Sequence, residues 1–326
     1  MSLSEDAQPC STAENFLVRE LALLRIPLED IVTATNNFSQ ENLLKRGGNA
    51  DVYKGLLLTH SKDWIQVVIR KFGHLCVTSE FYGEIEIIAS LKHRNVVSLI
   101  GFCDEKKERM IVMEHALNGS LDKYLSDPTV LTWSQRLDIC FGAALASKSI
   151  HFYIHGIRSF KILLNKDWEA KVLHCIESKS SWYDTKNSYV YSMGVILLEV
   201  LYGRKATIED VIRYLAHKEL DDHMIDPNLR KQMVPKSLSI ILETAYDCLN
   251  EKPYQQRPYM YQIVKKLKEA FEIQWKHENL SLMEKFTYLK IPLMQIMIAT
   301  NNFYGTYCIN IRLSTRGKLG AFEDSA

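Results

Sequence analysis

The sequence predicts an α+β protein in which a small, β-rich half with one helix precedes a larger helical half. Two observations carry this prediction. Short runs of branched apolar residues, typical of β-strands, come early in the chain, whereas apolar residues at helical spacing dominate from Trp133 onward. The length of 326 residues and the hydrophobic content of 47% are sufficient for a sizeable core.

In the first half, three strands and one helix are expected. The strands are expected at residues 51–53, 65–70 and 110–113. The helix is expected at 79–91, where Phe81, Glu84, Ile85 and Ile88 fall on one stripe. The stripe turns the carboxylate of Glu84 inward, and a buried carboxylate requires a cationic partner.

The second half is expected to be built from helices. A long helix at 133–149 carries an apolar side formed by Leu137, Cys140, Phe141 and Ala144. Further helices are expected at 190–202 and 240–249. The apolar stretch 190–203 contains Glu199 and is too short to span a bilayer, so it is interpreted as a core helix.

A 15-residue segment occurs twice. Residues 24–38, LRIPLEDIVTATNNF, return as residues 289–303, LKIPLMQIMIATNNF, with 10 of 15 positions identical. In each copy the apolar residues are spaced as in a short amphipathic helix, with a proline at its start and the Asn-Asn pair at its end. The separation between the copies suits a whole domain and is too long for a solenoid repeat. The chain therefore reads as one full unit followed by the opening of a second.

The net charge and the cysteine spacing indicate which kinds of partner and compartment to expect. Forty basic and 39 acidic residues give a net charge of +1, which disfavours nucleic acid or an anionic membrane as a general partner. The seven cysteines are scattered and never spaced as C-x-x-C, which indicates reduced thiols. Other proteins are therefore the expected partners, and the cytoplasm is the expected compartment, with contact to the inner face of the plasma membrane through those partners.

Two runs carry a family resemblance: LKHRNVVSLIGFC at 91–103 and IVMEHALNGSL at 111–121. They resemble eukaryotic protein kinases, and the chain is most similar to plant receptor-like Ser/Thr kinases of the Feronia or malectin-receptor group. Their kinase domains follow a helix that ends in Ala-Thr-Asn-Asn-Phe, as at Ala34–Phe38 here.

The resemblance implies a bilobal protein-kinase-like fold over about residues 24–272. Four parts are expected: an N-terminal extension with an amphipathic helix, a kinase-like N-lobe, a C-lobe with a shortened activation segment, and a tail that repeats the start of a second unit. Their expected bounds are 1–40, 41–115, 116–273 and 274–326.

Nucleotide-facing positions also follow from the resemblance. They are Gly47, Val52, Val68, Arg70, Glu84, Glu114 and Ala116. In the glycine-rich loop only Gly47 of three glycines remains, since Lys45 and Ala50 hold the other two slots, and a plain hairpin turn is the favoured interpretation. Arg70 replaces the family's lysine and is expected to pair with Glu84, whereas the neighbouring Lys71 points to the opposite face.

Most of the residues that protein kinases use for phosphate transfer are replaced in this sequence. In the catalytic loop no acidic residue lies between His155 and Lys161, so the general base is absent, with His155 itself as the alternative base. Lys161 holds the magnesium-binding asparagine slot and Arg158 the phosphate-facing lysine slot, while His174 replaces the metal-binding aspartate. Gly156, Arg158, Lys161 and His174 are therefore degenerate slots, and no catalytic or metal site is assigned.

A further loss affects the segment that binds protein substrates in relatives. Val190 lies only 16 positions after His174, and the family's Pro-Glu sequence is absent, together with the glutamate that pairs with Arg257 in relatives. Arg257 must therefore pair elsewhere or stay hydrated. Tyr189 replaces the aspartate that ties down the catalytic loop in relatives.

A pseudokinase that works as a signalling scaffold or allosteric partner is the leading hypothesis. The alternatives are a weakly active Ser/Thr kinase that uses Asp167 or Asp184, a metal-independent nucleotide-binding switch, and a decaying duplicate without a role. ATP binding is expected to be weak, and Mg²⁺ binding is not expected.

Overall fold

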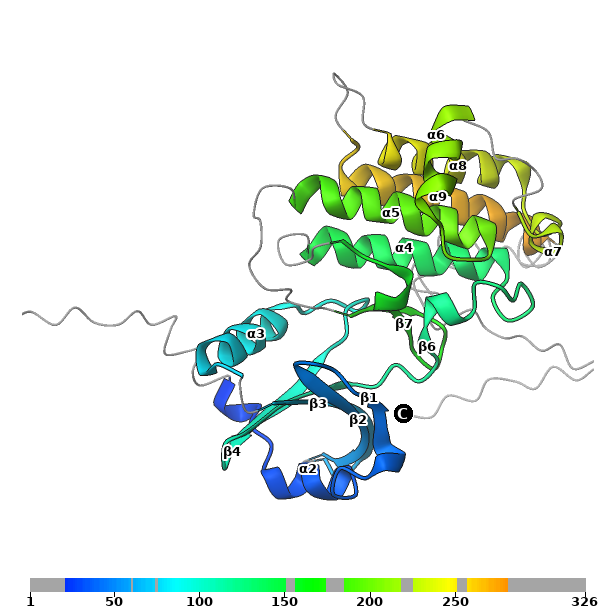
Figure 1. The fold of residues 1–326 in the computed structure, drawn as a ribbon. Helices are drawn as coiled ribbons and strands as arrows, with labels where there is room; N and C mark the ends of the chain where they lie inside the picture. The colour runs from blue at the N-terminus through cyan, green and yellow to red at the C-terminus, as the bar shows by residue number, and fades with distance from the viewer. Residues whose placement is uncertain are drawn as a thin grey trace, which may run out of the picture. The chain divides into compact units, whose positions relative to one another are not determined.

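The computed structural model describes residues 21–59, 61–73, 76–150, 156–173, 185–217, 225–250 and 257–280. Its contacts divide the chain into one unit from Met1 to Trp275 and another from Lys276 to Ala326. The first unit contains a sheet-rich half and a helical half, in the order that the sequence predicts (Figure 1).

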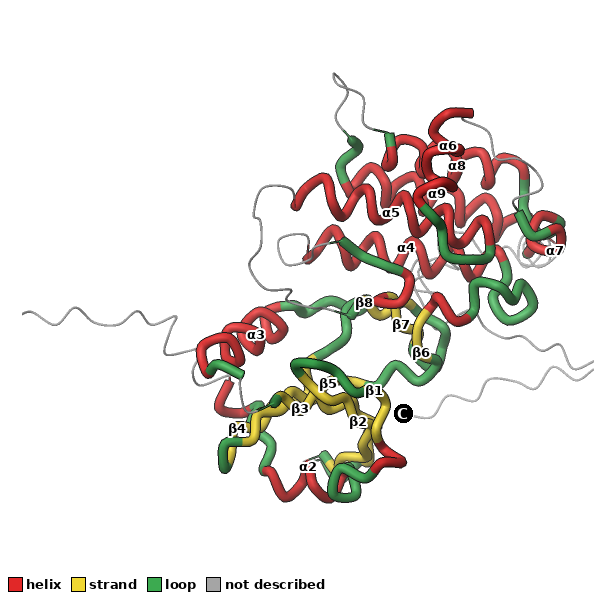
Figure 2. Tube along the Cα trace, in the orientation of Figure 1, coloured by secondary structure: helices red, strands yellow, loops and turns green. Residues whose placement is uncertain are grey.

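The sheet-rich half is built on five antiparallel strands (Figure 2). Their spatial order is β1 (Leu43–Lys45), β2 (Ala50–Leu58), β3 (Trp64–Phe72), β5 (Glu108–Glu114) and β4 (Leu99–Glu105). The three predicted strands are confirmed as parts of β2, β3 and β5, although each is longer than predicted. The strand β4 was not predicted.

A helix packs on each side of this sheet. The helix α3 (Thr78–Ser90) buries Phe81, Ile85 and Ile88 as predicted, in a cluster with Phe102 and Ile111. On the other side the short helix α2 (Leu28–Ala34) buries Ile31 against β2, β3, β4 and β5. Pro27 precedes α2 and Asn36 and Asn37 follow it in the left-handed region, so the predicted start and stop are confirmed.

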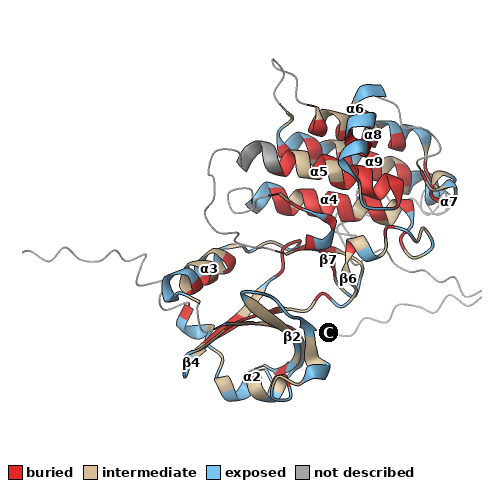
Figure 3. Ribbon diagram, in the orientation of Figure 1, coloured by how far each residue is buried: buried red, intermediate tan, exposed pale blue. Residues whose placement is uncertain are grey.

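The helical half contains α4 (Trp133–Ile150), α5 (Thr185–Tyr202), α6 (Ile208–His217), α7 (Pro227–Arg230), α8 (Pro235–Leu249) and α9 (Met260–Glu278). The predicted helices are confirmed as α4, α5 and α8, whereas α6, α7 and α9 were not predicted. Figure 3 shows the buried residues concentrated along α4, α5 and α8. None of the helices in the described ranges is long and apolar enough to cross a membrane.

A buried arginine ties the helical half together. Arg136 in α4 is fully buried and donates hydrogen bonds to the carbonyl oxygens of Leu131 (2.9 Å), Leu125 (2.7 Å) and Val200 (3.2 Å). Burial lowers the pKa of its guanidinium to about 10, so the group stays charged at neutral pH. The acceptors belong to α5 and to the loop before α4, and one side chain therefore joins three segments.

A small second sheet lies beside the connection to the first half. It consists of β6 (Gly119–Ser120), β7 (Ile162–Leu164) and β8 (Ala170–Val172), all antiparallel. The segment before β4 runs along β8, where Val97 N donates to Val172 O (3.0 Å) and Val172 N donates to Asn95 O (2.7 Å). Backbone hydrogen bonds thus join the two halves directly.

Candidate functional site

The structure brings Arg70 and Glu84 together. Arg70 on β3 and Glu84 on α3 form an ion pair with 2.5 Å between Nη1 and Oε1, and their side chains are only 23% and 11% exposed. The guanidinium of Arg70 also lies over the ring of Phe72, 4.9 Å from its centroid. The predicted pairing is therefore present in the structure, with an arginine in place of the family's lysine.

Lys71 lies on the other side of the strand. Its ammonium group pairs with Glu108 at 2.8 Å and sits 4.3 Å from the ring centroid of Phe38. Alternation along β3 turns successive side chains to opposite faces, so Lys71 does not reach Glu84. The prediction that Lys71 points to the face opposite to that of Arg70 is confirmed.

The degenerate glycine-rich loop is the turn of a hairpin between β1 and β2. Gly47 N donates to Asp51 Oδ1 at 3.3 Å, and a Cβ at Gly47 would lie 2.5 Å from the carbonyl oxygen of Ala50. Lys45 pairs with Val52, and the register shifts between Leu43 and Lys45. Gly47 is thus required by a close approach within the turn itself, as expected for a structural hairpin.

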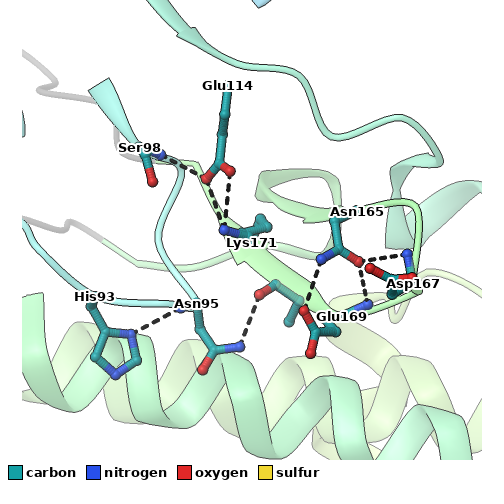
Figure 4. A network of polar contacts seen from close by, with 9 residues as sticks. His93, Asn95, Ser98, Glu114, Asn165, Asp167, Glu169 and Lys171 are labelled. Carbon is teal, nitrogen blue, oxygen red and sulfur yellow. Dashed lines mark hydrogen bonds and ion pairs between the residues drawn. The ribbon is translucent and has the colours of Figure 1, made fainter. Parts of the chain in front are cut away.

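Glu114 lies at the end of β5, where the chain passes from one half to the other. Its carboxylate accepts hydrogen bonds from Ser98 N (2.8 Å) and from Lys171 Nζ (3.0 and 3.1 Å), as Figure 4 shows. Val67 pairs with Glu114 across the sheet, and Val68 pairs with Met113. Ala116, two residues on, is buried.

Lys171 is a site residue that the sequence analysis missed. It lies on β8 with its side chain 14% exposed, and its pairing with Glu114 joins the second sheet to the first. The sequence feature that could have identified Lys171 is its position as a charged residue between the apolar residues Ala170 and Val172. Only the fold places this lysine next to the carboxylate of Glu114.

Further polar contacts connect the segment before β4 to β8, close to Glu114 and Lys171 (Figure 4). Asn95 is buried and donates from Nδ2 to Ala170 O at 3.0 Å, while its backbone N donates to His93 Nδ1 at 3.1 Å. Burial, reinforced by Arg94 and Lys171, lowers the pKa of His93. His93 is therefore neutral at physiological pH, which allows Nδ1 to act as an acceptor.

The described part of the catalytic loop starts at Gly156, which has φ of 66°. Arg158 is exposed, and its carbonyl accepts from Lys161 N at 2.8 Å in the short turn that leads into β7. Lys161 is 9% exposed, and its carbonyl accepts from Leu173 N at 2.8 Å. The lysine that the resemblance assigns to the magnesium-ligand slot is thus buried.

His155, His174 and Asp184 lie outside the described residues, as does the shortened segment between His174 and the start of α5. Among the residues that are described, no cluster of three or more His, Cys, Asp or Glu side chains could hold a metal ion. Magnesium prefers carboxylate and carbonyl oxygens as ligands, and the ammonium side chain of Lys161 supplies neither.

Asp167, one of the two carboxylates weighed as a substitute base, lies in the turn between β7 and β8. Its backbone N donates to Asn165 Oδ1 at 2.9 Å in that turn. Lys161 and Leu173 meet at the other end of this hairpin, so the strand length separates Asp167 from the degenerate slots. Asp167 and Lys161 thus lie at opposite ends of the β7–β8 hairpin.

Two residues whose surroundings differ from those in relatives are described in α5 and before α9. Tyr189, in the slot of the missing aspartate, is buried in α5. The guanidinium of Arg257 lies over the ring of Tyr191, 5.2 Å from its centroid, as a partly buried cation–π contact. Of the two alternatives expected for Arg257, pairing elsewhere or hydration, the structure shows the first, with the ring of Tyr191 as the partner.

Comparisons with known proteins identify the family that this chain is similar to. Residues 38–175 match the family model described as protein tyrosine and serine/threonine kinase. A probable receptor-like protein kinase of Arabidopsis thaliana is 33% identical over 320 residues, which cover 83% of this chain and 38% of the relative. The receptor-like protein kinase THESEUS 1 of the same plant is 32% identical, with 76% and 34% covered.

A solved structure is similar as well. The pseudokinase domain of BIR2, described as an immune regulator of the RLK/Pelle family, aligns with a TM-score of 0.61 at 25% identity and covers 78% of this chain and 89% of that chain. The chain spans little more than a third of the length of the two curated relatives. The bilobal fold that the sequence predicts is confirmed by this likeness and by the family match.

Proposed function

Because the chain carries a protein-kinase domain of the receptor-like kinase family, we propose that this domain is a pseudokinase, which acts by binding other proteins and does not transfer phosphate. The observation that carries the proposal is a contrast between two parts of one site. The scaffold pair Arg70–Glu84 is formed, whereas the loop from Gly156 to Lys161 offers two cations and no carboxylate.

This contrast has a direct chemical consequence. Phosphate transfer requires a group that accepts or orients the proton of the attacking hydroxyl, and ligands that hold a cation on the phosphates. In this chain the base slot is Gly156 and the ligand slot is Lys161. An ammonium group there repels a divalent cation, so neither requirement is met by the described residues.

We expect nucleotide binding to be weak for steric reasons. Val68 stands where relatives have alanine, and its half-buried side chain adds two methyl groups to the sheet face that would cover the base. Lys45 and Ala50 add side chains at the hairpin turn, which hinder the close approach of backbone N–H groups to phosphate. The shape of the sheet is retained, but its fit to ATP is reduced.

A kinase-like domain that does not transfer phosphate can still act by binding other proteins. BIR2 is described as an immune regulator with a pseudokinase domain, and this chain shares its fold at 25% identity. Receptors or active kinases at the inner face of the plasma membrane are the partners that we propose, with the cytoplasm as the compartment. A near-neutral net charge fits recognition by local shape and charge.

A phosphate-transfer assay with matched variants tests the proposal. Wild type, Arg70→Ala and Lys71→Ala are incubated with labelled ATP, Mg²⁺ and a generic protein substrate. Lys71 is the control because it adjoins Arg70 in sequence but pairs with Glu108 on the opposite face. We expect the same background for all three. Incorporation by wild type that Arg70→Ala removes and Lys71→Ala keeps would show an active kinase.

Melting temperature measured with ATP tests the nucleotide expectation separately. We expect a shift below about 1 °C at 1 mM ATP, unchanged by EDTA, since binding stabilises a fold by RT ln(1 + [L]/Kd). A large shift that EDTA leaves intact would instead support a metal-independent nucleotide switch. A shift that EDTA abolishes would indicate a magnesium site and contradict the proposal.

A further inference from the structure

The surface under α2 is formed by buried side chains from four strands. We call it the α2 site, and Ile31, which is 1% exposed, is its central occupant. The site consists of Leu57, Val67, Ile69, Cys103, Met110 and Val112. Partly buried side chains of the docked segment complete the contact, and they are Ile26, Leu28, Ala34 and Phe38.

Backbone contacts fix the segment before α2 against β4. Ile26 N donates to Phe102 O at 2.8 Å, and Phe102 N donates to Leu24 O at 2.9 Å. Gly101 allows this approach, because a Cβ there would lie 2.4 Å from Leu24 O and 2.6 Å from Ile26 Cδ1. The contact depends on backbone and on the absence of a side chain at Gly101, so any segment of similar shape could make it.

The segment 289–303 repeats residues 24–38, which dock on the sheet. Most of the differences between the two copies fall on positions that are exposed in the first copy. Of the eight positions that are buried or half-buried in residues 24–38, seven are identical in the second copy, and the eighth changes Val32 to Met297. The other four changes all fall on exposed positions. They are Arg25 to Lys290, Glu29 to Met294, Asp30 to Gln295 and Thr33 to Ile298.

Three identical positions are exposed, and each has a role in the turns. Pro27 precedes the first residue of α2, and Asn36 and Asn37 adopt φ of 50° and 55°, which asparagine tolerates better than most residues. Thr35, also identical, donates to Ile31 O at 2.8 Å and accepts from Phe38 N at 3.1 Å. The second copy therefore keeps both the contact residues and the residues that shape the segment.

We propose that residues 289–303 of one molecule occupy the α2 site of a second copy of this chain when the resident α2 leaves it. The exposed changes favour a second copy. They replace two acidic groups and a threonine with Met294, Gln295 and Ile298, and an exchanged pair of helices could bury this more apolar side.

The resident helix has the advantage in the unmodified monomer. Only residues 39–42 separate the repeated segment from β1, so its effective concentration at the site is of the order of millimolar or more. Glu29 and Asp30 also lie in its first turn, where the helix dipole favours negative charge, and the second copy lacks both. We therefore expect exchange at high protein concentration or when α2 is weakened.

The first test weakens α2 in the full chain. Ile31→Ala removes the central contact, and light scattering after size exclusion is measured from about 1 to 100 µM, a range below the effective concentration of the tethered helix. We expect dimers that increase with concentration. Adding Ile296→Asp should abolish them, whereas adding Gln295→Asp, which only restores the charge of Asp30, should not. Monomers throughout, or dimers that persist with Ile296→Asp, would overturn the proposal.

The second test uses wild type, so it does not depend on the folding of a variant. A synthetic peptide of residues 286–305 is added in excess, and hydrogen exchange is followed at the α2 amides, such as that of Thr35, which donates to Ile31 O. We expect at least tenfold faster exchange at millimolar peptide, because the resident helix is displaced. A peptide with Ile296→Asp should have no effect. Equal exchange with and without the unmodified peptide would contradict the proposal.

Discussion

At the scale of single residues, the described part of the site is organised around the ion pair between Arg70 and Glu84. Arg70 and Glu84 pair because a half-buried carboxylate on the inner side of a helix needs a cation, and the guanidinium supplies it. Lys161 is buried where relatives hold a metal ligand. The described residues thus hold one charged pair that supports the fold, and the pseudokinase proposal rests on the contrast between this pair and the cations of the loop from Gly156 to Lys161.

Removing the cation of this pair should destabilise the fold. Arg70→Ala leaves Glu84, whose side chain is 11% exposed, without its ion-pair partner, and we expect a loss of about 1 to 3 kcal/mol in the free energy of unfolding. The matched variant Lys71→Ala should cost less, because both partners of the Lys71–Glu108 pair are more than 25% exposed. Urea unfolding measures both, and equal losses would contradict this ranking.

Asp138 in α4 gives a residue-scale prediction of pH dependence. Burial, reinforced by Glu169, raises the pKa of its carboxyl to about 6. Above pH 6 the carboxyl is ionised in the folded state, and its burial lowers the free energy of unfolding. This loss becomes smaller as the pH falls toward 4, which is the ordinary pKa of an aspartate in the unfolded chain. Asp138→Asn should therefore stabilise the protein by about 1 to 2 kcal/mol at pH 7.5. The gain should shrink between pH 6 and 4, and a gain independent of pH would exclude this cause.

At the scale of elements, docking of α2 depends on close contact with β4. The strand offers Gly101 at the point where residues 24–26 cross it, and the backbone hydrogen bonds of Phe102 lie directly beside. The helix itself has only seven residues, too few to be stable alone in water. Its stability therefore comes from the sheet that it covers.

A methyl group at Gly101 should disrupt this docking. Gly101→Ala places a Cβ within 2.4 Å of Leu24 O, so the segment must shift, and we expect a loss of about 1 to 3 kcal/mol in the free energy of unfolding. Gly48→Ala is the matched control, because nothing lies within 4 Å of a Cβ there. Thermal and urea unfolding of both variants check the prediction, which fails if Gly101→Ala is as stable as Gly48→Ala.

At the scale of the whole first unit, the two halves are joined through the segment before β4. Backbone hydrogen bonds link Asn95 and Val97 to β8, and the Glu114–Lys171 pair links β5 to the same strand. Kinase activity in general needs two lobes that move relative to each other during turnover. A protein that only displays a binding surface has no need of that motion, and a firm joint is compatible with such a role.

Loss of the ion pair between Lys171 and Glu114 should weaken the connection between the two halves of the first unit. In Lys171→Ala we expect faster hydrogen exchange at Ser98 N, which donates to the same carboxylate, and a stability loss of about 1 kcal/mol for a partly buried pair. Lys166→Ala, an exposed lysine in the neighbouring turn, should change neither quantity. Equal exchange at Ser98 in the two variants would show that the ion pair does not hold the joint.

Much of the fold could be predicted because local patterns carry it. The stripe of Phe81, Ile85 and Ile88 identified α3, and alternation identified the opposite directions of Arg70 and Lys71. The strand β4 was missed because Gly101 interrupts its short apolar run, and glycine disfavours strands unless a close contact requires it. The degenerate slots could be assigned only through motif spacing, and those at His155 and His174 lie outside the described residues.

The sequence by itself determined the order of strands and helices, the repeat, and the absence of a carboxylate from the catalytic loop, because periodicity and residue identity are local properties. The tertiary structure alone decided that Lys171 meets Glu114, that Arg257 lies over Tyr191, and that seven of the ten residues shared by the two repeats are buried or half-buried in the first copy. These are contacts between segments far apart in the chain. Packing of the whole chain selects such contacts, and no short-range pattern encodes them.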